Sequence, residues 1–368
     1  MNDTKTEPQT AARAAALKTE LVSEIKLPTA VLALAASPDG GTLYASCLDG
    51  GVYEVGAETG AATLVGKHES YASGVAFLAK SSTLISAGYD GALQWHDLAA
   101  RKTIRKVAAH KFWSWRMAVS GDDRLVASAT GQYLCGGYKY EPAPEKEPSV
   151  KVFHALTGEL IHRFSHVPPV LSVAFSPDHQ FLAAGNMMGE VRVWELAGGR
   201  LAANWTTPGF TSWGIIKSHH YIGGIFAMAF SSDGRELLVG GMGPMRDPMA
   251  GNGKQTWQRF AWRETPAKKI DEIHEGESGN GLMETLAFHP ANDYFVMAGR
   301  LAQGKWNTAF FHAQNGSLLH GLDTRMRVTR AVFRADGKQI FLAGATGQEK
   351  KKDGKFPDFG RIKIYALA

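Results

Sequence analysis

The stretch Val170–Leu196, VLSVAFSPDHQFLAAGNMMGEVRVWEL, contains three short apolar runs separated by a Pro-Asp turn and by a Met-Met-Gly segment. Runs of β-branched and aromatic residues bounded by turn residues predict three consecutive β-strands. Three strands cannot bury both faces of their own sheet. A stable fold therefore requires neighbouring units of the same kind.

The VAFSPD core of this unit recurs along the chain. The seven copies are matched at Ala36, Phe77, Val119, Phe175, Phe230, Phe288 and Phe333. Successive matched positions lie 41, 42, 56, 55, 58 and 45 residues apart. The shorter spacings fit the roughly 40 to 45 residues of a four-stranded propeller blade, and the longer ones require insertions. Helical periodicity is absent from these units, so the sequence predicts an all-β, seven-bladed β-propeller of four-stranded blades.

The two ends of the chain complete each other. The last copy stops after its third strand, at RIKIYALA (361–368), while an alternating run, ELVSEIKL, stands unassigned at 20–27. A ring of blades has no open sheet edge only if this N-terminal run pairs with the last blade. We therefore expect residues 20–27 to form the outer strand of the seventh blade. The expected organisation is a flexible segment at 1–19 followed by one propeller domain at 20–368.

The three-strand pattern and its VRVWEL ending resemble the blades of WD-repeat proteins, and the resemblance covers residues 20–368. The copies are degenerate, because only Trp194-Glu195 approaches the Trp-Asp dipeptide of that family. His68, His110 and His166 each lie nine residues before the matched position of their copy, where the family has its Gly-His turn. This placement strengthens the resemblance.

In the second copy, His68 is accompanied by Ser86 and Asp90, which are also the residue types of a nucleophilic triad. The resemblance implies that the three form a structural hydrogen-bond network between strands instead. A triad also needs an oxyanion hole, and the sequence offers no identifiable one. The structural interpretation is therefore preferred. It covers His68, Ser86, Asp90, His110 and His166.

The insertions fall on one face of the predicted propeller. Because blade strands run alternately up and down, the links between first and second strands and between third and fourth share one face, and they are all short. The remaining links share the other face and carry all the insertions, at 131–149, 206–223, 241–256, 274–282, 300–306 and 346–360. Random tolerance would scatter insertions over both faces. Their concentration indicates a binding surface held by a rigid scaffold.

These loops and the turn HKFWSWR (110–116) are rich in aromatic residues and arginine, the types enriched at interface hot spots. The alternative for each tryptophan is that it packs the loops against one another. The candidate partner-binding residues are Trp113, Trp115, Arg116, Trp213, His219, Tyr221, Trp257, Glu284, Trp306, Arg325 and Arg327.

The resemblance implies a non-enzymatic scaffold that binds a protein or peptide partner on the inserted face. The alternative is a small-ligand-binding or hydrolytic or lyase-type enzyme that uses the channel mouth. Its candidates are Glu284 as base, Arg116 and Arg327 as anion clamps, and the pair His219 and His220. No phosphate loop, metal-ligand spacing or nucleophile elbow is identifiable, so we expect no catalytic residue, no metal and no cofactor.

Composition narrows the partners and the compartment. The net charge of +5 is spread along the chain and acidic EKEP and HEGESG segments interrupt any basic groove, which disfavours nucleic acid. Cys47 and Cys135 stand alone, as expected of free thiols in a reducing compartment. Neither a signal-peptide core nor an apolar run of membrane-spanning length is present. We expect a cytoplasmic protein without membrane contact, and a monomer by default.

Overall fold

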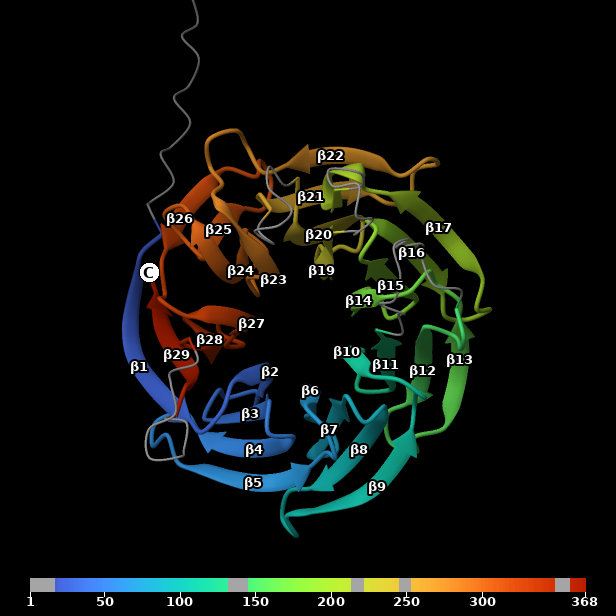
Figure 1. The fold of residues 1–368 in the computed structure, drawn as a ribbon, viewed down its shortest axis with the longest axis vertical. Helices are drawn as coiled ribbons and strands as arrows, with labels where there is room; N and C mark the ends of the chain where they lie inside the picture. The colour runs from blue at the N-terminus through green and yellow to red at the C-terminus, as the bar shows by residue number, and fades with distance from the viewer. Residues whose placement is uncertain (1–16, 132–144, 213–221, 245–252, 348–357) are drawn as a thin grey trace, which may run out of the picture.

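The computed structural model of the protein describes residues 17–131, 145–212, 222–244, 253–347 and 358–368. They form seven antiparallel sheets arranged as blades around a central axis, with the first strand of each blade innermost and the last outermost (Figure 1). The fold is the all-β, seven-bladed propeller that the repeat predicts. Among these residues, no helix is long and apolar enough to cross a bilayer.

The first four blades contain four strands each. Blade 1 comprises β2 (Val31–Ala36), β3 (Thr42–Cys47), β4 (Gly51–Gly56) and β5 (Ala62–Lys67). Blade 2 comprises β6 (Ala72–Leu78), β7 (Thr83–Gly88), β8 (Ala92–Asp97) and β9 (Lys102–Ala108). Blade 3 comprises β10 (Ser114–Val119), β11 (Leu125–Thr130), β12 (Val150–His154) and β13 (Leu160–Phe164). Blade 4 comprises β14 (Val170–Phe175), β15 (Phe181–Asn186), β16 (Glu190–Glu195) and β17 (Leu201–Thr206).

Blade 5 differs from the expected pattern by one short strand. It comprises β19 (Ile222–Phe230), β20 (Glu236–Met242), β21 (Gln255–Ala261) and β22 (Lys268–Glu272), with a two-residue strand, β18 (Thr211–Ser212), paired to the start of β19. A single 3-10 turn, η1 (Pro208–Phe210), precedes β18. Blade 6 comprises β23 (Asn280–Phe288), β24 (Tyr294–Gln303), β25 (Thr308–His312) and β26 (Leu318–Leu322).

Blade 7 is assembled from both ends of the chain. It comprises β27 (Arg327–Phe333), β28 (Gln339–Ala345) and β29 (Gly360–Leu367), with β1 (Thr19–Leu27) as its outer strand. β1 pairs antiparallel with β29 from Thr19 opposite Leu367 to Leu27 opposite Gly360. The ring is therefore closed by hydrogen bonds between the N-terminal and C-terminal strands.

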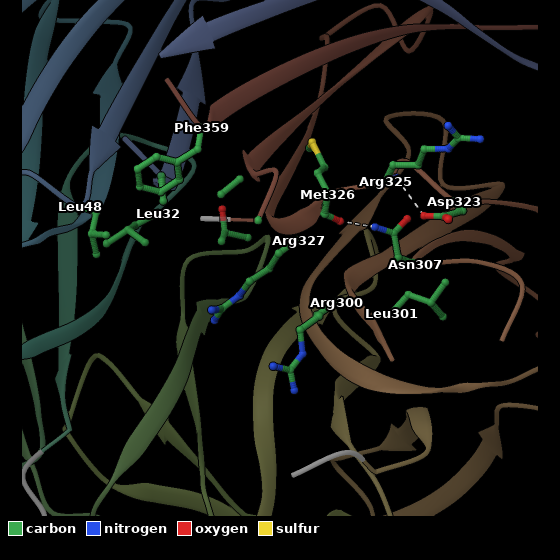
Figure 2. A pocket seen from close by; sticks show the side chains of 14 residues that line it. Leu32, Leu48, Arg300, Leu301, Asn307, Asp323, Arg325, Met326, Arg327 and Phe359 are labelled. Carbon is green, nitrogen blue, oxygen red and sulfur yellow. Dashed lines mark hydrogen bonds between the residues drawn. The ribbon is translucent and has the colours of Figure 1, made fainter. Parts of the chain in front are cut away.

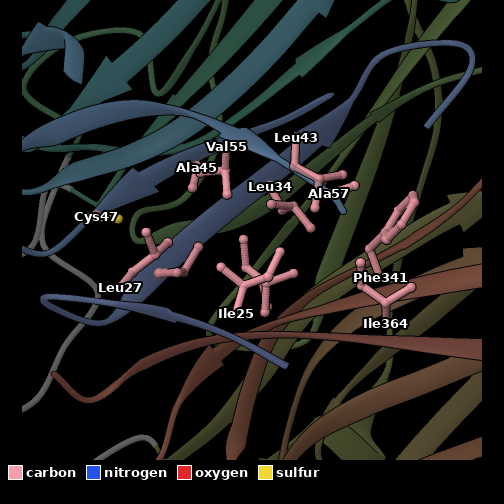
Figure 3. Close-up of a cluster of buried hydrophobic side chains, with 13 residues drawn as sticks. Ile25, Leu27, Leu34, Leu43, Ala45, Cys47, Val55, Ala57, Phe341 and Ile364 are labelled. Atoms are coloured by element: carbon pink, nitrogen blue, oxygen red, sulfur yellow. The ribbon is translucent and has the colours of Figure 1, made fainter. Parts of the chain in front are cut away.

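The hydrophobic core lies between neighbouring blades, because both faces of each sheet pack against the next sheet. One buried cluster joins blades 7 and 1, and it includes Ile25 and Leu27 from β1 together with Phe341 and Ile364 (Figure 3). Cys47 is buried in the same cluster, where desolvation raises the pKa of its thiol. This packing makes Cys47 an unreactive core residue.

All first strands share one irregularity that shapes the channel. The pairing register between first and second strands shifts by one residue, as in a β-bulge, at the fourth residue before each matched position. The bulged residues are Leu32, Ser73, Trp115, Leu171, Phe226, Glu284 and Thr329. A bulge releases backbone groups from the ladder, so it supplies free carbonyl oxygens at the inner edge of each blade.

Strand order places the long links on one side of the ring. They connect β11 to β12, β17 to β19, β20 to β21, β22 to β23, β24 to β25 and β28 to β29. Each either joins a second to a third strand or leads from one blade to the next. In antiparallel blades these links emerge on the same side. We call this side the loop-bearing face.

Candidate functional site at the channel mouth

The seven innermost strands carry very little charge. Over β2, β6, β10, β14, β19, β23 and β27 the only ionisable side chains are three arginines and one glutamate: Arg116, Glu284, Arg327 and Arg330. All seven strands fall within the described residues. We call these four residues the channel charges. They come from blades 3, 6 and 7 alone.

Glu284 and Arg327 form a bidentate ion pair between blades 6 and 7. Arg327 donates from Nε to Oε1 of Glu284 at 2.6 Å and from Nη2 to Oε2 at 2.9 Å. The carboxylate side chain is 10% exposed, whereas the arginine side chain is 51% exposed. Parallel N–H···O bonds to both oxygens fix the pair in one geometry, and these hydrogen bonds to the Glu284 carboxylate raise the pKa of Arg327. Both oxygens of the Glu284 carboxylate are thus bound by the Arg327 guanidinium.

Arg116 lies across the channel from blade 3. Its Nη2 donates to the carbonyl oxygens of Phe226 at 3.0 Å and Glu284 at 3.1 Å, and its Nε donates to that of Leu171 at 3.4 Å. These three acceptors are the bulged residues of blades 4, 5 and 6. A single side chain therefore ties three successive blades to a fourth. Burial lowers the pKa of Arg116, while the Glu284 charge opposes this shift.

A row of aromatic rings runs along the mouth beside these charges. Tyr89 stacks on Trp113 with ring centroids 4.8 Å apart and on Trp115 at 5.5 Å, and Tyr71 lies 5.5 Å from Tyr89 in a tilted arrangement. Phe112 also stacks on Trp113, with ring centroids 4.7 Å apart. We call these five residues the aromatic row. It remains partly open to solvent, because Tyr71 is 45% and Trp113 is 37% exposed.

The aromatic row and the channel charges are close enough to interact electrostatically. Desolvation raises the pKa of Tyr89 to about 12, and the charges of Arg116 and Arg327 oppose that rise. Trp115 also precedes Arg116 directly in β10. The two sets of side chains therefore lie near one another at the mouth.

A cavity of about 620 Å³ opens next to these side chains, between blades 6, 7 and 1. Its walls include Leu32, Phe359, Arg300, Arg325 and Arg327. Figure 2 shows the side chains of Arg300 and Arg327 extending in the same direction, whereas that of Arg325 points away from them. The cavity thus combines apolar walls with cationic groups, as ligand-binding clefts commonly do.

Comparison with known families agrees with the fold. The family model described as "WD domain, G-beta repeat" matches residues 158–195, which run from the outer strand of blade 3 to Trp194-Glu195 at the end of β16. The chain is a WD-repeat propeller.

The WD-repeat propeller also has relatives of known name. It is 22% identical to Telomerase protein component 1 of Mus musculus and 25% identical to Telomerase protein component 1 of Rattus norvegicus, each over 246 residues. Each alignment covers 67% of this chain but 8% of the relative. The similarity therefore concerns a small part of those long proteins.

The structure separates the predicted partner-binding residues of the propeller into groups. Trp113, Trp115, Arg116, Glu284 and Arg327 come together at the channel mouth, and Arg325 lies exposed on the wall of the adjacent cavity. Trp213, His219 and Tyr221, with His220 of the enzyme alternative, lie outside the described residues.

Trp257 and Trp306 belong to the core rather than to the surface. Trp257 is fully buried and packs edge-on against Phe295 and Phe311. Trp306 is 5% exposed and donates from Nε1 to the carbonyl oxygen of Glu277 at 2.9 Å. Trp257 is in fact a residue of β21, whose side chains are buried almost throughout.

The residues assigned to a structural network are buried and bonded. His68 Nδ1 lies 2.9 Å from Asp90 Oδ1, and its Nε2 lies 2.8 Å from Ser86 Oγ. Ser86 is fully buried and its hydroxyl also lies 2.7 Å from His96 Nε2. Both neighbours of the hydroxyl are thus imidazoles, which leaves no approach for a substrate. Sequence reasoning missed His96, although it stands where blade 4 has Trp194.

The networks of blades 3 and 4 are simpler. His110 Nε2 lies 3.0 Å from Ser128 Oγ, whereas His166 Nε2 donates to the carbonyl oxygen of Ala184 at 3.3 Å. Ala184 stands at the position of Ser86 and Ser128, so the backbone replaces the missing hydroxyl. Within the described residues, no group of three or more His, Cys, Asp or Glu side chains is arranged to hold a metal ion.

Proposed function

We propose that this WD-repeat propeller is a non-enzymatic interaction scaffold that binds a peptide or protein partner on its loop-bearing face, around the channel mouth. The observation that carries the proposal is the aromatic row, which is stacked, partly exposed and close enough to Arg116 and Arg327 to feel their charges. Rigid aromatic rings beside arginine supply large contact areas at low entropic cost. WD-repeat propellers are typical interaction scaffolds. Both relatives are named as a protein component of telomerase, which is consistent with a role in binding other molecules.

The enzyme alternative has less support. Its candidate base, Glu284, has both carboxylate oxygens engaged by Arg327, at 2.6 and 2.9 Å. A general base needs a free oxygen within hydrogen-bond reach of the proton that it removes. The proposal therefore assigns Glu284 a positioning role for Arg327.

The test is selection of binding peptides from a random display library on the immobilised full-length protein. Peptides that bind should bind the variant Trp113→Ala at least about tenfold more weakly, since interface tryptophans commonly contribute more than 1.4 kcal/mol. Dissociation constants from fluorescence polarisation measure this loss. Trp113 is partly exposed, so the variant should melt like the wild type.

The matched control is Ile104→Ala. Ile104 is 53% exposed on β9, an outer strand away from the mouth, so its truncation should leave peptide affinity unchanged. Equal affinities for the two variants, or a library that yields no binding peptide, would contradict the proposal.

A further inference from the structure

Two of the channel charges occupy equivalent positions in different blades. Arg116 and Arg330 each lie three residues before the matched position, directly after the bulge, in blades 3 and 7. The residues at this position in the other five blades are small: Ala33, Gly74, Ser172, Ala227 and Thr285. Small side chains leave space at the inner edge of the ring. The two arginines are therefore exceptions within the repeat.

The two arginines differ in what they bind. Arg116 donates to three carbonyl oxygens, as described above. Arg330 has no side-chain hydrogen bond and no ion pair with any of the described residues, and its electrostatic interactions are repulsion from Arg116 and attraction to Glu284. Desolvation and the Arg116 charge lower the pKa of Arg330. Arg330 is half-buried, and its guanidinium nitrogens are not sealed from solvent, so the group stays accessible from the channel while none of the described residues accepts a hydrogen bond from it.

Nothing else on the innermost strands compensates this cation. The seven strands hold three arginines and one carboxylate, and that carboxylate binds Arg327 through both oxygens. The residual charge of the channel is therefore positive. Such an unpaired arginine can bind a ligand that carries an anionic group.

We propose that Arg330 is the anion-binding group of the channel and receives the carboxylate of an acidic residue that the peptide partner inserts through the loop-bearing face. This inference rests on the proposed function. A guanidinium fork matches a carboxylate with two parallel hydrogen bonds. Arg330 lies three residues along β27 from Arg327 at the mouth, about 10 Å deeper in the channel. The acidic residue must therefore enter the channel, while flanking residues contact the aromatic row.

The probe is a fluorescein-labelled hexaglutamate peptide with an amidated C-terminus, and hexaglutamine is the uncharged control. Fluorescence polarisation with the full-length protein should detect hexaglutamate and not hexaglutamine. Arg330→Gln should weaken hexaglutamate binding at least tenfold, and Arg330→Lys should retain part of it. Glu284→Gln should tighten binding several-fold, because it removes the competing carboxylate. These opposite effects distinguish an anion site from a merely structural role.

The matched control is Arg200→Gln. The Arg200 side chain is 69% exposed and pairs with Glu195 at 3.2 Å on the outer part of blade 4, so its removal subtracts the same charge without touching the channel. Arg330→Gln should melt at or above the wild-type temperature, because it removes an uncompensated cation. Equal weakening by Arg200→Gln and Arg330→Gln would overturn the proposal, since it would mean general attraction to a basic protein.

Two further results separate the possible failures. If hexaglutamate does not bind while library peptides still bind in a Trp113-dependent way, the anion site is wrong and the proposed function stands. If citrate or inorganic phosphate raises the melting temperature of the wild type but not of Arg330→Gln, and hexaglutamate does not compete, the channel binds a small anion and the peptide assignment is overturned.

Discussion

Deletion of residues 1–28 is expected to lower the melting temperature of the propeller by roughly 5 to 15 °C. The deletion removes β1, which supplies the outer strand of blade 7 through its pairing with β29. It also removes Ile25 and Leu27, which are 4% and 0% exposed in the cluster between blades 7 and 1 (Figure 3). Burying one such side chain contributes about 1.5 to 3 kcal/mol.

Polar interactions add to this loss. Glu24 forms ion pairs with Arg361, at 2.9 Å between Oε1 and Nε, and with Lys363, at 3.3 Å between Oε2 and Nζ, and both cations lie on β29. Without β1, the backbone edge of β29 and these two charges face solvent. Circular dichroism melts of the truncated and full-length proteins measure the effect, and they should be run at low concentration because an open strand edge promotes aggregation.

Two controls test whether the loss of stability comes from β1 itself. Deletion of residues 1–16 removes none of the contacts described here and should leave the melting temperature unchanged. A synthetic peptide of residues 17–28, added to the protein that lacks 1–28, should restore part of the lost stability by mass action. A 1–28 deletion that melts like the full-length chain would show that the ring does not depend on β1.

The architecture was predictable because it is repeated. Seven copies of one strand-turn-strand pattern define the blade count, and a missing fourth strand at one end with a spare alternating run at the other defines the closure. The confinement of insertions to one face followed from strand alternation alone. The histidines of the Gly-His turns were recognisable for the same reason, since their spacing from the matched position is constant.

The channel mouth was only partly predictable, because its contacts join residues that are far apart in the sequence. Arg116 was a candidate, but its bonds to carbonyl oxygens 55, 110 and 168 residues away depend on the curvature of the ring and on the bulges. Arg330 is not among the sequence candidates, because in the sequence it is only the first residue of the repeat copy RAVFRADGK (330–338). The sequence analysis assigns Trp306 to the surface because it ends the insertion at 300–306, whereas its indole packs on Phe311.

Acid is expected to destabilise the propeller well before its carboxylates titrate. His96 and His166 are 0% and 1% exposed, and burial lowers the pKa of His96 to about 4 and that of His166 to about 3. The His68 ring adds to the shift of His96, and the Arg192 charge to that of His166. Burial also lowers the pKa of His110. All three histidines are therefore neutral in the folded protein at pH 5.

The direction of the effect follows from proton binding. In the unfolded chain these histidines titrate near pH 6.5, so between pH 6.5 and 4 the unfolded state binds more protons than the folded state. The stability they contribute is complete above about pH 7 and is lost as the pH falls toward the folded pKa values. At pH 5 the loss is roughly 2 kcal/mol for each of His96 and His166. Asp and Glu stay largely ionised at that pH, which assigns the loss to histidine.

Urea unfolding at pH 7 and pH 5 tests this assignment. The variants His96→Gln and His166→Gln cannot take up a proton, so each should show a smaller difference in unfolding free energy between the two pH values than the wild type. Glutamine can still donate to Ser86 or to the carbonyl of Ala184, which limits the cost at pH 7. The control His274→Gln, whose side chain is 41% exposed, should keep the wild-type difference. If all three variants keep it, the acid sensitivity resides in other groups, and the buried histidines act only through their hydrogen bonds.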